Sequence, residues 1–183
     1  MITLVSNSPT RQKILREYQI AFQQVSIDFD EESIASIVPK TFAYEACKHK
    51  LERALQELGS DCAILVADSV VSVSSCMQRK PKTKEEAREM LEKQSGQEIA
   101  IITAQILKTS KIEVCDISQT ILKLQEFHKI DLKEYLESSL WQGKAGAVMV
   151  EGFHSKYIIK QKGLFSTALG LSVEKFLPFF AII

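Results

Sequence analysis

The sequence predicts an α/β fold in which a mixed, twisted sheet is flanked by helices. Strand-like apolar runs alternate with helical patterns in the first half of the chain, and strand-like runs cluster in the second half. The chain has 183 residues, of which 45% are hydrophobic and 25% charged, an ordinary composition for a globular protein. This length favours a single domain over residues 1–183.

The N-terminal elements are predicted as a strand followed at once by a capped helix. Residues 2–5 form a short apolar run that is typical of a buried strand. Ser8 and Pro9 are the residue types favoured at the N-cap and first position of a helix, which we expect over 9–17. Its apolar face would hold Ile14, Leu15 and Tyr18. An acid-rich loop follows, and then a longer helix over 42–58.

The middle of the chain predicts one buried strand, a helix and two further strands. Residues 62–73 are apolar apart from an interruption at Asp68 and Ser69. Thr83 and Glu86 make a capping box, with Glu86 reaching back toward the helix start. Gly96 is a natural C-cap for this helix. The strands that come next are predicted over residues 99–107 and 117–124.

The C-terminal third is predicted to mix short elements. We expect a short helix over 131–139, strands over 146–150 and 156–161, and a terminal helix around 166–177. The apolar tail over 176–183 is far shorter than the roughly 20 residues of a membrane span. We expect this tail to dock on the body of the protein or on a partner chain.

Charge and cysteine content exclude several classes of protein. Lys plus Arg and Asp plus Glu number 23 each, so no overall field attracts nucleic acid or an acidic membrane. The four cysteines form no Cys-x-x-Cys pair and no zinc spacing, which predicts reduced, buried thiols. The first residues lack the basic and apolar segments of a signal peptide. We therefore expect a cytoplasmic protein with neither nucleic acid nor membrane as its partner.

The stretch from residue 4 to 15, LVSNSPTRQKIL, suits an anion. A helix that starts directly after a strand presents free N–H groups and a positive dipole end. Ser6 and Ser8 add hydroxyls, and Arg11 stands in the first turn, where the dipole disfavours a cation. A bound phosphate would explain this placement. The alternative is an ordinary capped helix with Arg11 in solvent.

Asp68 interrupts an apolar strand, and a buried carboxylate must be hydrogen-bonded, neutral or bound to a cation. Ligands gather at the carboxyl ends of strands in α/β sheets, and Asp68 would mark such an end. The alternative is a turn between two hairpin strands. One acid of the loop over 28–32 could join Asp68 around Mg²⁺ or Mn²⁺, which prefer oxygen ligands; the alternative there is a solvated loop.

Two lysines complete the candidate site. Lys50 lies among Ala46, Cys47 and Ala54 of the long helix, where it either snorkels to solvent or reaches into a pocket. Lys80 follows the Asp68 strand in a loop. Cations for phosphates, with acids to hold a metal or activate water, suit a polyphosphate ester as substrate. Walker A, G-x-G-x-x-G and G-x-S-x-G patterns are absent from the sequence.

The order of these motifs resembles the Maf family, nucleoside triphosphate pyrophosphatases once linked to septum formation. The family pattern L-A-S-x-S-P-R-R is matched by LVSNSPTR, and D-E-[ST] by EES at 31–33. A-D-T-V-V is matched by ADSVV, and G-K-P with its following helix by RKPKTKEEAREMLEKQSG. D-K-A-G-A-Y-x-x-Q-G is matched by GKAGAVMVEG. E-K-A is matched less well, by HKL at 49–51, and a late G-L-P is matched by GLS at 170–172.

The resemblance implies an inosine-triphosphatase-like fold with a cleft between two lobes. It also implies hydrolysis of a nucleotide to the monophosphate and pyrophosphate with Mg²⁺ or Mn²⁺, in a protein that is often a homodimer. Asp68 would be the catalytic carboxylate and Glu32 its partner acid, and both would hold the metal. The substrate would bind, mainly through its phosphates, to Ser6, Arg11, Lys50, Lys80 and Ser69, the last standing for the threonine after the aspartate.

Departures from the pattern bear on the base and on catalysis. Thr10 replaces the first arginine of S-P-R-R, Gly143 the aspartate of D-K-A-G, and Glu151 the glutamine before Gly152. Thr10 and Glu-Gly-Phe at 151–153 resemble the family branch that acts on 7-methyl-GTP and related nucleotides, in which Glu151 would read the base. The alternative function is a nucleotide-binding or regulatory protein, linked to cell division, whose catalysis is impaired by these changes.

Overall fold

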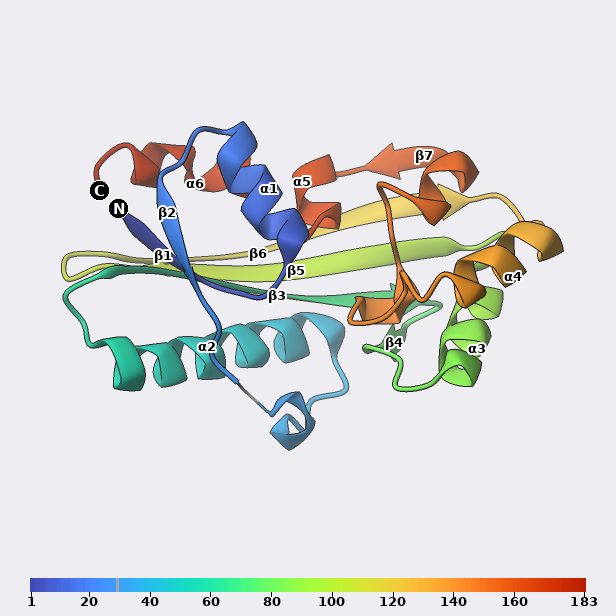
Figure 1. The fold of residues 1–183 in the computed structure, drawn as a ribbon, viewed down its shortest axis with the longest axis horizontal. Helices are drawn as coiled ribbons and strands as arrows, with labels where there is room; N and C mark the ends of the chain where they lie inside the picture. Colours follow the sequence, from blue (N-terminus) through green and yellow to red (C-terminus); the bar gives the residue numbers. More distant parts are fainter. Residues whose placement is uncertain (29) are drawn as a thin grey trace.

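A seven-stranded sheet runs along the molecule in the computed structural model, which describes residues 1–28 and 30–183 except for the side chain of Glu32 (Figure 1). The strand order is β2 (Phe22–Val25), β1 (Ile2–Val5), β3 (Ala63–Val73), β5 (Glu98–Lys108), β6 (Glu113–Leu124) and β7 (Ile158–Lys162), with β4 (Cys76–Gln78) paired to β3. β1 pairs in parallel with β2 and β3, and the other pairs are antiparallel. The predicted α/β class with a mixed sheet is confirmed.

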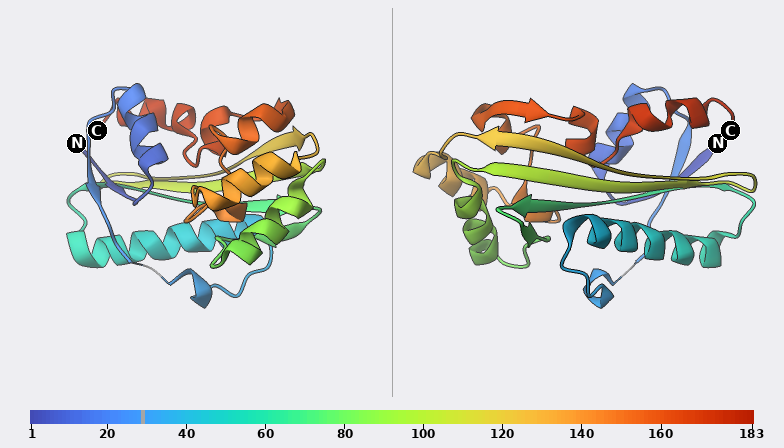
Figure 2. Two further views of the ribbon diagram at one scale, coloured as in Figure 1. Left: turned by 45° about the vertical axis from the view of Figure 1, so that its right-hand side comes forward. Right: turned by 180° about the vertical axis from the view of Figure 1, so that it is seen from behind.

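Helices cover both faces of this sheet (Figure 2). The long helix α2 (Pro39–Leu58) packs one apolar stripe on β3 and β5. On the opposite face, α1 (Pro9–Glu17) and α6 (Val173–Phe180) cover the same end. α3 (Lys84–Gln94), α4 (Lys129–Glu137) and the segment 145–157 cover the other end. Three apolar clusters result, and the long strands β3 and β5 contribute to all of them.

Several predicted elements are confirmed. The strand over 2–5 and the helix over 9–17 have the expected bounds. α3 begins after its Thr83 cap, whose side chain accepts a hydrogen bond from the Glu86 N–H, and Gly96 follows it at φ +71°. The Glu86 carboxylate reaches back to the Lys82 N–H rather than to that of Thr83. α6 docks the tail on the body through buried Phe176.

Other predictions are wrong, and tertiary contacts explain them. Residues 146–150 form no strand in the described chain but a 3-10 turn, η2 (Ala145–Ala147), because Gly146 turns at φ +59°. The terminal helix is split into α5 (Phe165–Ala168) and α6 by Gly170 at φ +97°. Tyr18 caps α1 and is 39% exposed, because its hydroxyl bonds to Glu174 instead of packing.

Bounds and burial differ at three further places. α2 begins at Pro39 rather than at residue 42 because proline suits a first helical turn. The half-exposed strand β2 lies in a part of the chain for which no strand was expected. Cys76 and Cys115 are exposed rather than buried, although all four cysteines are free. Within the described part of the chain, no helix is long and apolar enough to cross a membrane.

Candidate active site

A cleft of about 520 Å³ opens where the end of β1, the start of α1, the middle of β3 and the segment 142–151 meet. Each element brings polar side chains to it, so the cleft is lined by both cations and acids. The lining includes Ser6, Asn7, Thr10, Arg11, Asp28, Glu31, Lys50, Asp68, Ser69, Lys80, Gln142, Lys144 and Glu151. The predicted residues Ser6, Arg11, Lys50, Asp68, Ser69, Lys80 and Glu151 are therefore brought together.

Asp68 reaches the cleft from the middle of β3, not from its end. β3 continues through Asp68 and Ser69 without interruption, so the predicted strand end and the alternative hairpin turn are both wrong. The parallel neighbour β1 stops at Val5, which pairs with Val66. Asp68 thus lies two residues beyond the carboxyl end of β1, where the sheet leaves room for a ligand.

The Asp68 carboxylate is buried beside one cation. Its Oδ1 accepts a hydrogen bond from Lys50 Nζ at 3.1 Å, and the two side chains are only 5% and 13% exposed. Lys50 Nζ also lies 3.4 Å from the Ala67 carbonyl, so this lysine reaches into the pocket instead of snorkelling. Asp68 Oδ2 is buried with no hydrogen-bond partner among the described residues. Since an unsatisfied buried oxygen is costly, this atom is suited to a cation or to a water.

Arg11 turns inward from the first turn of α1. Its Nε donates to the Gly170 carbonyl at 2.8 Å, and its two terminal nitrogens donate to Ser6 Oγ and Ser69 Oγ, each at 3.2 Å. Burial lowers the pKa of this guanidinium, and the Asp68 charge opposes that change. The alternative with Arg11 in solvent is excluded, because the residue is 9% exposed. Arg11 thereby ties the start of α1 to β3 and to the turn at Gly170.

The helix start beside Arg11 has the predicted cap. Ser8 Oγ accepts from the Arg11 N–H at 3.3 Å, and Ser6 Oγ accepts from the Ser8 N–H at 3.2 Å. The N-terminal turn of α1 therefore lines the cleft, with the Ser6 and Ser8 hydroxyls each held by a backbone N–H. A helix N-terminus in this position favours an anionic group.

Lys80 meets the acidic loop across the cleft. Its Nζ is ion-paired with Glu31, and the Arg79 guanidinium donates to the Glu31 carbonyl. Glu31 begins the 3-10 turn η1 (Glu31–Ser33). The acid predicted from the sequence is Glu32, whose side chain lies outside the described residues; Glu31 was not singled out. The acidic run was the available signal, but spacing alone did not identify the acid that faces Lys80.

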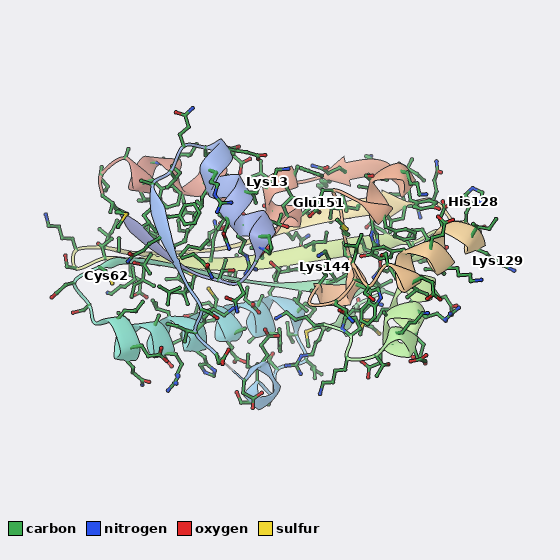
Figure 3. All side chains as sticks on the ribbon, viewed as in Figure 1. Lys13, Cys62, His128, Lys129, Lys144 and Glu151 are labelled. Carbon is green, nitrogen blue, oxygen red and sulfur yellow. The ribbon has the colours of Figure 1, made fainter. Side chains whose placement is uncertain are left out.

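The segment 142–151 forms the opposite wall. Glu151 accepts a hydrogen bond from the Thr10 hydroxyl at 3.2 Å, so two positions that depart from the family pattern touch each other. Figure 3 shows Lys144 and Glu151 on this segment, with Glu151 beside the start of α1. Lys144 lines the cleft although sequence reasoning did not select it. Its place in the Gly-Lys-Ala-Gly stretch at 143–146 was the signal.

The Mg²⁺ or Mn²⁺ site stays a prediction from the sequence. Among them, no group of three or more His, Cys, Asp or Glu is arranged to hold a metal ion. The unpartnered Asp68 Oδ2 fits an oxygen-loving cation, and Asp28 and Glu31 line the same cleft.

Comparison with known proteins finds a matching family model and close sequence relatives. The family model described as Maf-like protein matches residues 1–181. A nucleoside triphosphate pyrophosphatase from Helicobacter pylori is 46% identical over 94% of this chain and 91% of its own. One from a Nitratiruptor species is 45% identical over 96% of both chains. A solved HAM1 protein from Coxiella burnetii overlays on 67% of this chain and 72% of its own, with a TM-score of 0.48 and 13% identity.

Proposed function

Because the chain belongs to the Maf-like protein family, we propose that it is a nucleoside triphosphate pyrophosphatase, as its relatives are named. The observation that carries the proposal is the buried Asp68, with one oxygen on Lys50 and the other without a partner among the described residues. A carboxylate held in this way beside a polar cleft suits activation of a water. The surrounding cations suit a triphosphate.

The reaction divides the triphosphate between its α and β phosphates. A water oxygen forms a bond to the α phosphorus, the bond from that phosphorus to the bridging oxygen breaks, and pyrophosphate leaves with this oxygen. Asp68 Oδ2 takes the proton from the attacking water. Lys50 orients the carboxylate through its 3.1 Å contact with Oδ1.

The phosphates are held by groups on both sides of the cleft. Lys50 and Lys80 supply positive charge, while Ser6 and the N-terminal turn of α1 offer hydrogen bonds. Arg11 keeps Ser6 and Ser69 in place and adds its charge at short range. Asp68 and an acid of the 28–32 loop would hold Mg²⁺ or Mn²⁺, which would neutralise charge that develops on the phosphates.

The base lies toward Thr10 and Glu151 in this proposal. The Glu151 carboxylate is exposed at the cleft edge and accepts from Thr10. A carboxylate can accept from the guanine edge and favours the positive charge of a methylated base. We therefore propose a modified guanine nucleotide, such as 7-methyl-GTP, as the preferred substrate.

A panel of nucleotides tests the activity. Purified protein with Mg²⁺ or Mn²⁺ is incubated with standard and methylated nucleoside triphosphates, and monophosphate, pyrophosphate and orthophosphate are measured separately. Release of monophosphate and pyrophosphate is expected. Tight binding without release would favour the nucleotide-binding alternative, and successive release of orthophosphate would move the cleavage position.

Asp68→Asn gives the matching residue test. We expect turnover to fall by at least about 1,000-fold while the fold is kept, because the amide cannot take the proton of the water. Asp116→Asn is the control, since it removes a carboxylate that pairs with Lys175 at 2.8 Å outside the cleft. An Asp68→Asn variant as active as this control would refute the role of Asp68.

A further inference from the structure

A buried polar network lies beneath the 142–151 wall of the cleft, on the side away from the cleft lining. It consists of Gln78, Gln94 and His154, which are 5%, 0% and 0% exposed. The three come from β4, α3 and η3 (Phe153–Tyr157). They lie at the end of the molecule whose core is otherwise apolar and aromatic.

In this network a backbone N–H fixes which atom donates in each hydrogen bond of His154. The Met149 N–H donates to His154 Nδ1 at 3.1 Å, so Nδ1 is unprotonated and the proton of the neutral ring is on Nε2. Nε2 then donates to Gln94 Oε1 at 2.8 Å. Burial lowers the pKa of His154 to about 3, so the ring stays neutral.

The side-chain amide of Gln94 connects His154 to the backbone of the wall. With its oxygen occupied by His154, its nitrogen donates to the Gly146 carbonyl at 2.6 Å and to Gln78 Oε1 at 2.8 Å. Gln78 in turn donates to the Met90 carbonyl of α3 at 3.2 Å. The network therefore binds the wall at both Gly146 and Met149.

Anchored residues alternate with residues that line the cleft. Gly146 and Met149 bond to the network, whereas Lys144, Val148 and Glu151 line the cleft. A buried polar group that loses its hydrogen-bond partner is destabilising. Moving the wall would leave several such groups unpaired at once, so the wall is fixed in one position.

We propose that Gln94 and His154 are positioning residues that hold Lys144 and Glu151 against the bound nucleotide. This inference rests on the proposed function. It adds that substrate recognition by the wall depends on side chains that never touch the substrate.

The main test compares Gln94→Leu with Gln105→Leu. Gln105 is also fully buried, and its side chain makes two hydrogen bonds to the backbone of Ser172, at 3.0 and 2.9 Å, but none to the wall. We expect Gln94→Leu to raise KM roughly tenfold more than the control at similar kcat, the loss expected for one weakened charged contact. Adding Glu151→Gln should then change the ranking of bases less in the Gln94→Leu background than in the control background.

Equal KM changes, together with an equal effect of Glu151→Gln in both backgrounds, would reduce the network to a structural role and overturn the proposal. A second test compares a conservative with a non-conservative substitution of His154. His154→Gln can still accept from Met149 and donate to Gln94, so it should keep a near-normal KM, whereas His154→Leu should not. A KM that is raised equally in both variants would also contradict the proposal.

Two measurements separate this inference from the proposed function because neither needs turnover. ¹⁵N spectra should show His154 with its proton on Nε2. Hydrogen exchange at the Met149 amide should be at least about tenfold faster in Gln94→Leu than in Gln105→Leu. If the unaltered protein releases no pyrophosphate, the proposed function fails, and these two results still decide whether the network fixes the wall.

Discussion

At the scale of single residues, the buried Lys50–Asp68 ion pair belongs to the proposed active site and also affects the stability of the fold. Removing one member of a buried pair leaves the other charge uncompensated. We expect Lys50→Met to lower the free energy of unfolding by about 3 kcal/mol. Asp68→Asn in the Lys50→Met background should restore part of this loss. Denaturant titrations of Lys50→Met, Asp68→Asn and the double variant measure the three free energies of unfolding. A double variant whose loss equals the sum of the two single losses would contradict the prediction.

His154 predicts a distinct pH dependence of stability. Its pKa is 6.5 in the unfolded chain, and burial lowers the value to about 3 in the folded protein. Between these values only the unfolded chain binds the proton. The stability contributed by neutral His154 is therefore fully present above pH 6.5 and is lost as the pH falls toward 3. The slope approaches about 1.4 kcal/mol per pH unit.

Denaturant titrations from about pH 7 to about pH 4 measure this slope. His154→Gln, which does not titrate, should show a flatter decline than the unaltered protein. His128→Gln is the matched histidine-to-glutamine control, because His128 is exposed. Parallel curves for all three proteins would rule out the titration of His154 as the cause.

At the scale of elements, Gly146 makes the 3-10 turn η2 possible. Its φ is +59°, and a Cβ there would lie 2.9 Å from Val71 Cβ and 3.1 Å from Gln78 Oε1. We expect Gly146→Ala to cost roughly 3 kcal/mol, from left-handed strain plus overpacking. Gly143→Ala is the matched control, because its φ is +70° with nothing within 4 Å of the added Cβ. That control should cost about 1 kcal/mol, and equal costs would contradict the packing argument.

The same turn marks the limit of prediction from local pattern. Caps at Ser8 and Thr83 are local hydrogen bonds, so the starts of α1 and α3 were predictable from sequence. Residues 146–150 have the composition of a strand, yet contacts with β3, β4 and α3 fold them into a turn. β2 escaped prediction because it is a half-exposed strand at the edge of the sheet, without an apolar run.

At the scale of the whole molecule, the cleft gathers residues that are distant in sequence. Asp68, Lys50 and Arg11 were recognisable because each is a charge in an unusual local setting. Glu31 and Lys144 carry no such local mark, since their role depends on which element faces the cleft. Several charged residues that line the cleft were therefore recognisable from local pattern, while the contact between Thr10 and Glu151 needed the assembled fold.

A ligand in this cleft would contact α1, β3, the acidic loop and the 142–151 wall together, so binding should stabilise the whole fold. At a nucleotide concentration of roughly 100 times Kd, linkage adds about 2.7 kcal/mol, which for a chain of this size raises Tm by roughly 5 to 10 °C. Asp68→Asn with Mg²⁺ allows the measurement without turnover. Pyrophosphate alone should raise Tm less than the triphosphate, because it cannot reach Thr10 and Glu151. An equal rise with pyrophosphate would place all recognition at the phosphates and contradict base reading by the wall.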